Sequence, residues 1–129
     1  ETAQGAVEQL VVTDLDGDGD DEALVSFEFV QPGASPGAPG DLAALLVIDA
    51  TTREADTVLL SAVPDDAGDG EDGSFEIIEQ YRIMDVADLN GDGRMEVLVH
   101  AWYYEGAAVI VYTYDDGELT EVLATGCGA

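Results

Sequence analysis

Apolar and polar residues alternate in short runs along most of the chain, and clusters of Gly, Asp and Pro separate these runs. Within residues 107–114 the two sets of alternate positions differ in character: Val109, Val111 and Thr113 against Ile110, Tyr112 and Tyr114. A period of two residues is typical of a strand with two different faces, and no helical period is sustained. The pattern therefore predicts an all-β protein.

The runs predict two sets of four strands. The first set covers Gln9–Thr13, Ala23–Val30, Leu42–Ile48 and Thr57–Val63, and the second covers Phe75–Val86, Met95–Tyr104, Ala107–Tyr114 and Leu119–Ala124. Glu105-Gly106 and Asp115-Asp116-Gly117 are turn sequences that join the last three strands into hairpins. Residues 31–40 contain three prolines, which cannot donate to a sheet ladder, and are predicted to form a loop.

The two sets of strands belong to an internal repeat. Residues 12–25 align without gaps to residues 86–99, with an offset of 74 at every position. Each half then reads strand, acidic loop, strand, strand, strand, and neither half can bury an apolar face alone. We expect two four-stranded antiparallel blade-like repeats at residues 1–64 and 75–129, joined by an acidic, Gly-rich loop at 65–74. They would pack as an incomplete propeller or a sandwich.

The charge of the chain restricts its partners. It has 29 acidic residues and 3 basic ones, a net charge of −26, although 47% of its residues are hydrophobic. Such a polyanion repels nucleic acid and anionic membranes and attracts cations. The longest apolar run, Leu42–Ile48, is too short to insert in a membrane. The acidity fits both a solvated surface and dedicated metal sites, and we expect both.

Two nine-residue segments concentrate acidic residues at a spacing suited to calcium. Positions 1, 3, 5 and 9 are Asp14, Asp16, Asp18 and Glu22 in the first loop, and Asp88, Asn90, Asp92 and Glu96 in the second. Gly19 and Gly93 at position 6 permit a sharp turn, so that alternate side chains and the carbonyl of position 7 face one centre. Six to eight hard oxygen ligands favour calcium, and the lack of thiol or imidazole argues against zinc or copper.

The flanks of these loops identify the type of repeat. Position 12 of an EF-hand would be Val25 or Val99, and both flanks read as strands, so the loops are not EF-hands. The pattern Asp-x-[Asp/Asn]-x-Asp-Gly-x-x-[Asp/Glu] between strands resembles the FG-GAP or VCBS-type repeat of integrin-like β-propellers. The resemblance implies two calcium ions, with ligands at Asp14, Asp16, Asp18, Asp20 (carbonyl) and Glu22, and at Asp88, Asn90, Asp92, Arg94 (carbonyl) and Glu96.

A wider resemblance bears on location. The Leu-Asn-Gly-Asp-Gly run, Tyr103-Tyr104-Glu105-Gly106 and Gly126-Cys127-Gly128 are similar to segments of uncharacterised secreted bacterial proteins that carry this repeat. It names no activity. We expect an extracellular protein, since calcium loops of extracellular modules work at millimolar calcium, and the start at Glu1 fits removal of a leader.

Other residues offer little chemistry. His100 is the single histidine, there is no lysine, and no serine lies in a nucleophile elbow, so we expect no enzyme. Cys127 is either a free thiol or a cross-link to another chain or to a segment outside this sequence. Trp102, Tyr103, Tyr104, Tyr112 and Tyr114 either pack across strands or form a platform for a sugar or protein partner.

These observations favour a calcium-binding structural or interaction module. Two blades leave open sheet edges, so we expect a protein partner or self-association through these edges into a filament or surface layer, with residues 1–8 adding to a neighbour's sheet. The alternative is an adhesion module, or a carbohydrate- or protein-binding module, that is a fragment of a larger propeller protein.

Overall fold

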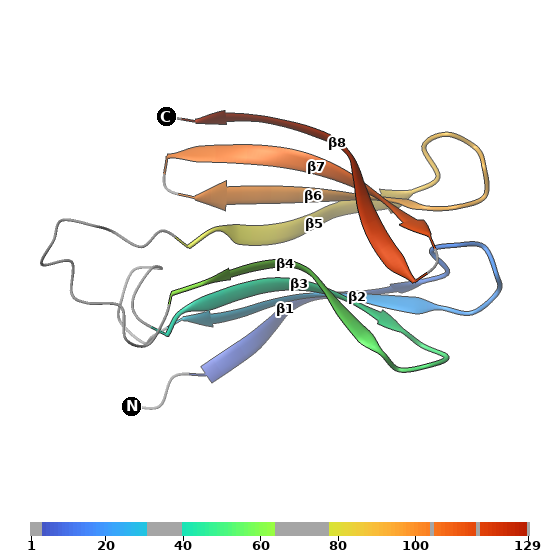
Figure 1. Cartoon of the computed structure of the whole chain (residues 1–129), viewed down its shortest axis with the longest axis horizontal. Coiled ribbons are helices and arrows are strands. Elements are labelled where there is room, and N and C mark those ends of the chain that lie inside the picture. Colours follow the sequence, from blue (N-terminus) through green and yellow to red (C-terminus); the bar gives the residue numbers. More distant parts are fainter. Residues whose placement is uncertain (1–3, 31–39, 64–77, 104, 116, 129) are drawn as a thin grey trace, which may run out of the picture.

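The computed structural model describes residues 4–30, 40–63, 78–103, 105–115 and 117–128. These residues contain no helix and form eight strands: β1 (Gln4–Thr13), β2 (Glu22–Val30), β3 (Leu42–Asp49), β4 (Ala55–Ala62), β5 (Gln80–Ala87), β6 (Glu96–Tyr103), β7 (Gly106–Asp115) and β8 (Glu118–Gly128). The strands make two antiparallel sheets, ordered β1-β2-β3-β4 and β5-β6-β7-β8, which lie one above the other (Figure 1). The prediction of an all-β fold with two blade-like sheets is confirmed.

Strand β1 begins five residues earlier than the sequence predicts. Gly5 and Val7 pair with Phe29 and Phe27 of β2, and a bulge at Glu8 restores the register before Gln9. The segment 4–8 is therefore part of the chain's own sheet. One side of this segment pairs with β2 and the other side is an edge of the sheet, so the hypothesis that residues 1–8 add to a neighbour's sheet stays a prediction.

Other boundaries follow turn chemistry. Gly117 has a φ of 83° between β7 and β8, which a side chain would strain, and this is the predicted turn. Between β3 and β4, Asp49 Oδ1 accepts the N–H groups of Thr51 and Thr52, which allows Arg53 a φ of 61°. The predicted loops at 31–40 and 65–74 lie outside the described residues except for Gly40. No helix in the described part of the chain is long and apolar enough to cross a membrane.

The hydrophobic core lies between the two sheets. Leu24, Leu45 and Val47 from the first sheet are almost completely buried against Val99 and Tyr114 from the second. Burying one such side chain contributes about 1.5–3 kcal/mol, so this shared core is the main force holding the sheets together.

The two sheets use opposite faces to make this core. Leu24 is buried and Val25 is half-buried in β2, whereas in β6 their equivalents Leu98 and Val99 are half-buried and buried respectively. Neighbouring residues of a strand point to opposite faces, so one sheet buries the face that the other exposes. This is how consecutive repeats stack in one direction, and it leaves one apolar face free on each sheet.

Two polar side chains of the first sheet cover the open edge of β5. Gln9 binds both backbone groups of Ile83: its Nε2 donates to the carbonyl at 3.0 Å, and its Oε1 accepts the N–H at 2.7 Å. Ser26 Oγ donates to the carbonyl of Tyr81 at 2.9 Å in a buried position. Buried backbone groups need such partners, and here side chains supply them in place of a ladder strand.

Candidate metal centre

The first acidic loop connects β1 to β2 and the second connects β5 to β6, and both project from the same end of the molecule (Figure 1). Each loop curls because two glycines take left-handed conformations, with φ of 80° at Gly17 and 96° at Gly19 in the first. The second repeats this with 78° at Gly91 and 88° at Gly93. The sequence placed a turn glycine only at position 6, and the structure adds one at position 4.

Asp14 is the centre of the first curl. Its Oδ1 accepts the N–H groups of Gly17 at 2.7 Å and Asp18 at 3.2 Å, and its Oδ2 accepts that of Gly19 at 2.9 Å. The N–H of Gly19 is the main cause that holds the pKa of Asp14 below its ordinary value. The carboxylate is thus fixed and charged, and Oδ2, which accepts one N–H group against two for Oδ1, keeps a lone pair for a cation.

The three aspartates of the first loop converge. Carboxylate oxygens of Asp14, Asp16 and Asp18 lie within 4.8 Å of one another, so this group could hold a metal ion. Two ligands of one calcium ion, each about 2.3–2.6 Å from it, lie no more than about 5 Å apart. The spacing and the hard oxygen donors therefore fit calcium. Burial is the main cause that raises the pKa of Asp16, and the charge of Asp18 adds to it.

Glu22, the last residue of the first loop, is buried and is not one of the three converging carboxylates. It is 3% exposed, and its Oε2 accepts the N–H of Leu15 at 2.8 Å. Burial raises the pKa of its carboxyl group, and the charges of the three loop aspartates raise it further. Tyr114 of the second sheet lies close enough for the charge of Glu22 to contribute, after burial, to raising the pKa of Tyr114 to about 12.

The second loop repeats these contacts. Asp88 accepts the N–H groups of Gly91 at 2.7 Å, Asp92 at 3.2 Å and Gly93 at 2.9 Å. Glu96 accepts the N–H of Leu89 at 2.6 Å, as Glu22 does from Leu15. The N–H of Gly93 is the main cause that lowers the pKa of Asp88. Two loops 74 residues apart thus share one hydrogen-bond pattern, whereas the group of three converging carboxylates that could hold a metal ion lies in the first loop.

One residue distinguishes the two loops. Asn90 replaces Asp16, and its Nδ2 donates to Glu96 Oε1 at 3.3 Å while its Oδ1 accepts the N–H of Asp92 at 3.0 Å. The amide still offers an oxygen to a cation but carries no charge. The first loop therefore holds the denser cluster of negative charge.

The side chains at position 7 point to other partners. Asp20 Oδ2 accepts the hydroxyl of Thr51 at 3.2 Å, and Arg94 Nη1 pairs with Asp115 Oδ1 at 2.7 Å. Both side chains are therefore bonded to residues outside the acidic loops. This is expected if the residue at position 7 binds an ion through its backbone carbonyl. The sequence did not reveal either contact, because both partners lie on distant turns.

The loops also touch each other. The N–H of Met95 donates to the carbonyl of Leu15 at 2.8 Å. A Cβ added to Gly17 would lie 2.8 Å from the carbonyl oxygen of Gly93, so only glycine fits there. The two acidic loops are therefore in direct contact with each other at the same end of the two sheets.

The aromatic residues do not form one platform. Tyr112 and Tyr114 are buried in the core, whereas Trp102 stacks on His100 with ring centroids 5.1 Å apart. His100 and Trp102 alternate with buried Val99 and so lie on the outer face. The described aromatic residues thus divide between two faces, which favours the first interpretation, packing across strands, over a single platform; Tyr104 lies outside the described residues.

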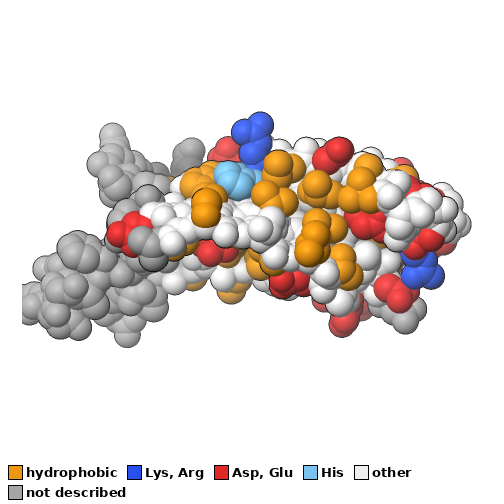
Figure 2. Space-filling view, turned by 90° about the horizontal axis from the view of Figure 1, so that it is seen from above, with side chains coloured by type: hydrophobic (Ala, Val, Ile, Leu, Met, Phe, Trp, Pro, Cys, Tyr) orange, Lys and Arg blue, Asp and Glu red, His pale blue; other side chains and the backbone are white. Residues whose placement is uncertain are grey.

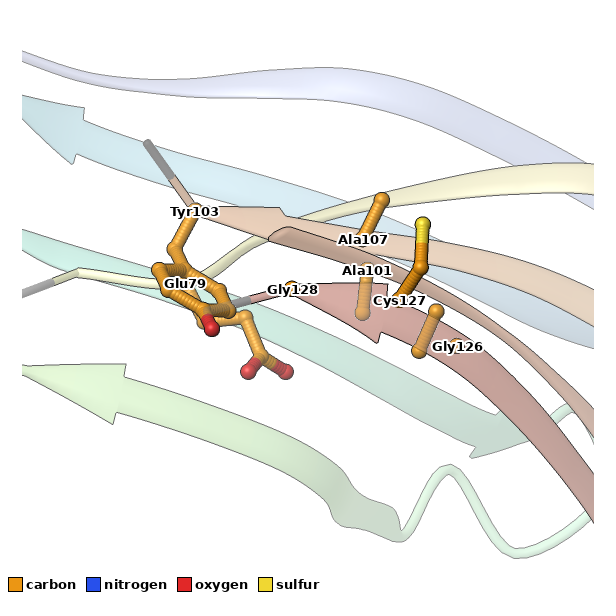
Figure 3. Close-up of a pocket in the computed structure, with 8 residues that line it drawn as sticks. Glu79, Ala101, Tyr103, Ala107, Gly126, Cys127 and Gly128 are labelled. Carbon is orange, nitrogen blue, oxygen red and sulfur yellow. The ribbon is translucent and has the colours of Figure 1, made fainter. Parts of the chain in front are cut away.

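An open pocket lies at the other end of the second sheet (Figure 3). Glu79 and Tyr103 line one side of it, and Ala107, Gly126 and Cys127 line the other. Cys127 is exposed and unbonded within this chain, so both interpretations from the sequence stay open. The Glu79 carboxylate and the Cys127 thiol lie on opposite sides of this pocket and point in different directions, and neither residue belongs to the acidic loops.

Comparison of the chain with protein-family models, with curated proteins and with solved structures found no match. The fold and the loops themselves are thus the basis for assigning a class: an all-β protein of two stacked four-stranded sheets with a carboxylate cluster at one end.

Replacing Glu22 with Gln should stabilise the calcium-free protein at neutral pH. Burial raises the folded-state pKa of Glu22 above its ordinary value of 4.5, so the folded state holds more protons and ionisation opposes folding above that pKa. The difference between variant and wild type should vanish as the pH falls below the ordinary value. Urea unfolding in calcium-free buffer at neutral and acidic pH measures it; an equal difference at both would contradict this explanation.

Proposed function

We propose that this chain is an extracellular calcium-binding structural module, in which one ion in each acidic loop holds the loops and the two sheets together. The observation that carries the proposal is the duplicated geometry: two loops with matching hydrogen bonds, position by position. Two Asp/Gly-rich turns that only allowed the chain to bend would not need the same hydrogen bonds at each position. The proposal includes the resemblance to FG-GAP or VCBS-type repeats, which implies one calcium ion in each loop.

The choice of calcium follows from the donors. Aspartate, glutamate, asparagine and carbonyl oxygens are hard ligands, and a curled loop is more flexible than the strict octahedron that magnesium requires. Loops of extracellular modules bind calcium at about 10⁻⁴–10⁻³ M, which supports a location outside the cell. A net charge of −26 also favours a cation-rich setting.

The ion's role is structural. The contact from Met95 to Leu15 joins the loops, so an ion that orders one loop also positions the other. Without a cation, the clustered carboxylates repel one another in the folded state. Calcium would remove this repulsion and bind the ends of β1, β2, β5 and β6 into one unit.

Assembly through sheet edges has less support. Gln9 and Ser26 already cover the edge of β5, one of the four edge strands, and no observation on β1, β4 or β8 favours an added strand. The adhesion alternative relied on an aromatic platform that the structure divides between two faces. We therefore retain the structural role as the leading proposal.

Titration calorimetry of loop variants tests the proposal. The wild type should bind two calcium ions, Asp14→Asn and Asp88→Asn should each lose one strong site with at least a tenfold drop in affinity, and the double variant should lose both. Asp21→Asn is the matched control, because Asp21 lies in the first loop outside the proposed ligand set. The proposal fails if Asp14→Asn binds two ions as tightly as the control does.

A further inference from the structure

The outer face of the β1–β4 sheet is apolar over its whole width. Val7, Leu10, Val12 and Leu60 are each more than half exposed on it. Every paired position of this face carries an apolar residue or glycine, with Thr57 as the exception. One quarter of the chain is charged, so a face without a paired charge indicates an interface rather than a solvated surface.

The outer face of the β5–β8 sheet is also rich in apolar side chains. Leu123 is 61% exposed, and its neighbours across the strands are Val111 and then Leu98, both half-buried. Figure 2 shows this face, where a band of hydrophobic side chains crosses the molecule beside the histidine. The same face also carries polar and charged residues: Asp85 in β5, the pair Arg82 and His100, Glu96 in β6, and the pair Asp115 and Glu118 at the β7–β8 turn.

The internal repeat indicates which partner surface would fit each outer face. Inside the molecule, the Leu24 face of the first sheet packs on the Val99 face of the second. The residues 74 positions away are Leu98 and Val25, and they lie on the two outer faces. The molecule therefore exposes an equivalent of each half of an interface that it already makes internally.

We propose that a second copy of this chain docks head to tail, with the outer face of its β1–β4 sheet on the outer face of the β5–β8 sheet. This goes beyond the calcium role, since it concerns the sheet faces and a partner protein. The apolar part of the contact repeats the internal one: Leu98 takes the place of Leu24, and the neighbour's Val25 takes the place of Val99. The polar part differs, because the equivalents of Gln9 and Ser26 are Ile83 and His100.

The loops agree with this docking. Leu15 is 0% exposed and its carbonyl binds Met95 of the next sheet, whereas its equivalent Leu89 is 59% exposed. Gly17 lies against the carbonyl of Gly93, whereas its equivalent Gly91 has open space around it. A neighbour's first loop would complete both contacts. Leu89 and Gly91 of the second loop therefore match the residues of the first loop that contact the next sheet, and in a single copy they contact no such sheet.

The two contact surfaces are different, so the association is heterologous and continues from copy to copy. It ends in a ring if the rotation closes or in a filament if it does not. Because typical propellers contain roughly four to eight blades, a ring would need two to four copies of this two-sheet chain. Repulsion between strongly acidic copies should make association stronger as salt is added, since salt screens charge but not apolar burial.

Single charges on the two faces test the proposal. In millimolar calcium, sedimentation should show the wild type as oligomers, and Leu10→Glu and Leu123→Glu each as monomers. Both side chains are 61% exposed, so neither change disturbs the core. Ala50→Glu, in the exposed β3–β4 turn, adds the same charge away from both faces and should associate like the wild type.

Mixing the two variants gives the decisive result. Leu10→Glu retains an intact β5–β8 face and Leu123→Glu retains an intact β1–β4 face, so an equimolar mixture should form heterodimers and nothing larger. A wild type that stays monomeric at every concentration overturns the proposal. So does a mixture that stays monomeric, or association that only one of the variants abolishes, because a symmetric contact would use one face alone. Calorimetry on the same variants should give unchanged calcium binding, so a failure here leaves the calcium role separately tested.

Discussion

Removing calcium should lower the melting temperature of this protein by about 15–20 °C. The proposed ligand set has four carboxylates in the first loop, three of which converge in the structure, and three carboxylates with Asn90 in the second. An ion present at about 100 times its dissociation constant adds roughly 2.7 kcal/mol per site when it binds only the folded state. Two sites therefore contribute about 5 kcal/mol, and at this chain length each kcal/mol shifts the melting temperature by roughly 3–4 °C.

Thermal unfolding followed by circular dichroism, with calcium and with excess EGTA, measures this shift. The Asp14→Asn, Asp88→Asn double variant is the internal control, because EGTA should hardly change its melting temperature. Magnesium at the same concentration should recover only part of the lost stability, since it prefers six ligands in a strict octahedron. Equal melting of the wild type in calcium and EGTA would rule out a structural role for the ions.

Replacing Leu15 with Ala should cost about 2–5 kcal/mol, whereas replacing Leu89 with Ala should change stability by less than about 0.5 kcal/mol. The two leucines hold the same position of the repeat and differ in burial, at 0% and 59% exposed. The first fills the core between the sheets, so its removal leaves a cavity. The second faces outward in a single copy.

Urea unfolding of both variants in saturating calcium gives the comparison, at a dilution where the wild type is monomeric. Calcium must be saturating because both leucine N–H groups bind the glutamate of their own loop. Similar losses for the two variants would mean that the repeats bury their leucines alike, and the stacking of the sheets described above would be wrong. At high concentration Leu89→Ala should weaken association.

The eight strands could be predicted because their alternation and turn glycines are local properties. The face that each sheet buries could not, since Leu24 and Val25 are both apolar, as are Leu98 and Val99. Alternation locates a core only when one face is polar. The start of β1 was also missed, because Gly5 and Ala6 have little strand preference alone and gain it by pairing with β2.

The loops were predictable for a similar reason. Spacing alone brings Asp14, Asp16 and Asp18 together, as the structure shows. The burial of Glu22 near Tyr114, and the contact between Met95 and Leu15, depend on how the second sheet is placed on the first. No pattern within one repeat contains that information.

Gln9 has a consequence for the precision of this fold. Apolar surfaces attract one another without preferred direction, so two such sheets could slide past each other at little cost. The amide of Gln9 holds both backbone groups of one residue, Ile83, as a strand would. A shift by a single residue would break two hydrogen bonds and leave buried peptide groups without partners. One side chain thus selects a single alignment from several that the hydrophobic effect alone would allow.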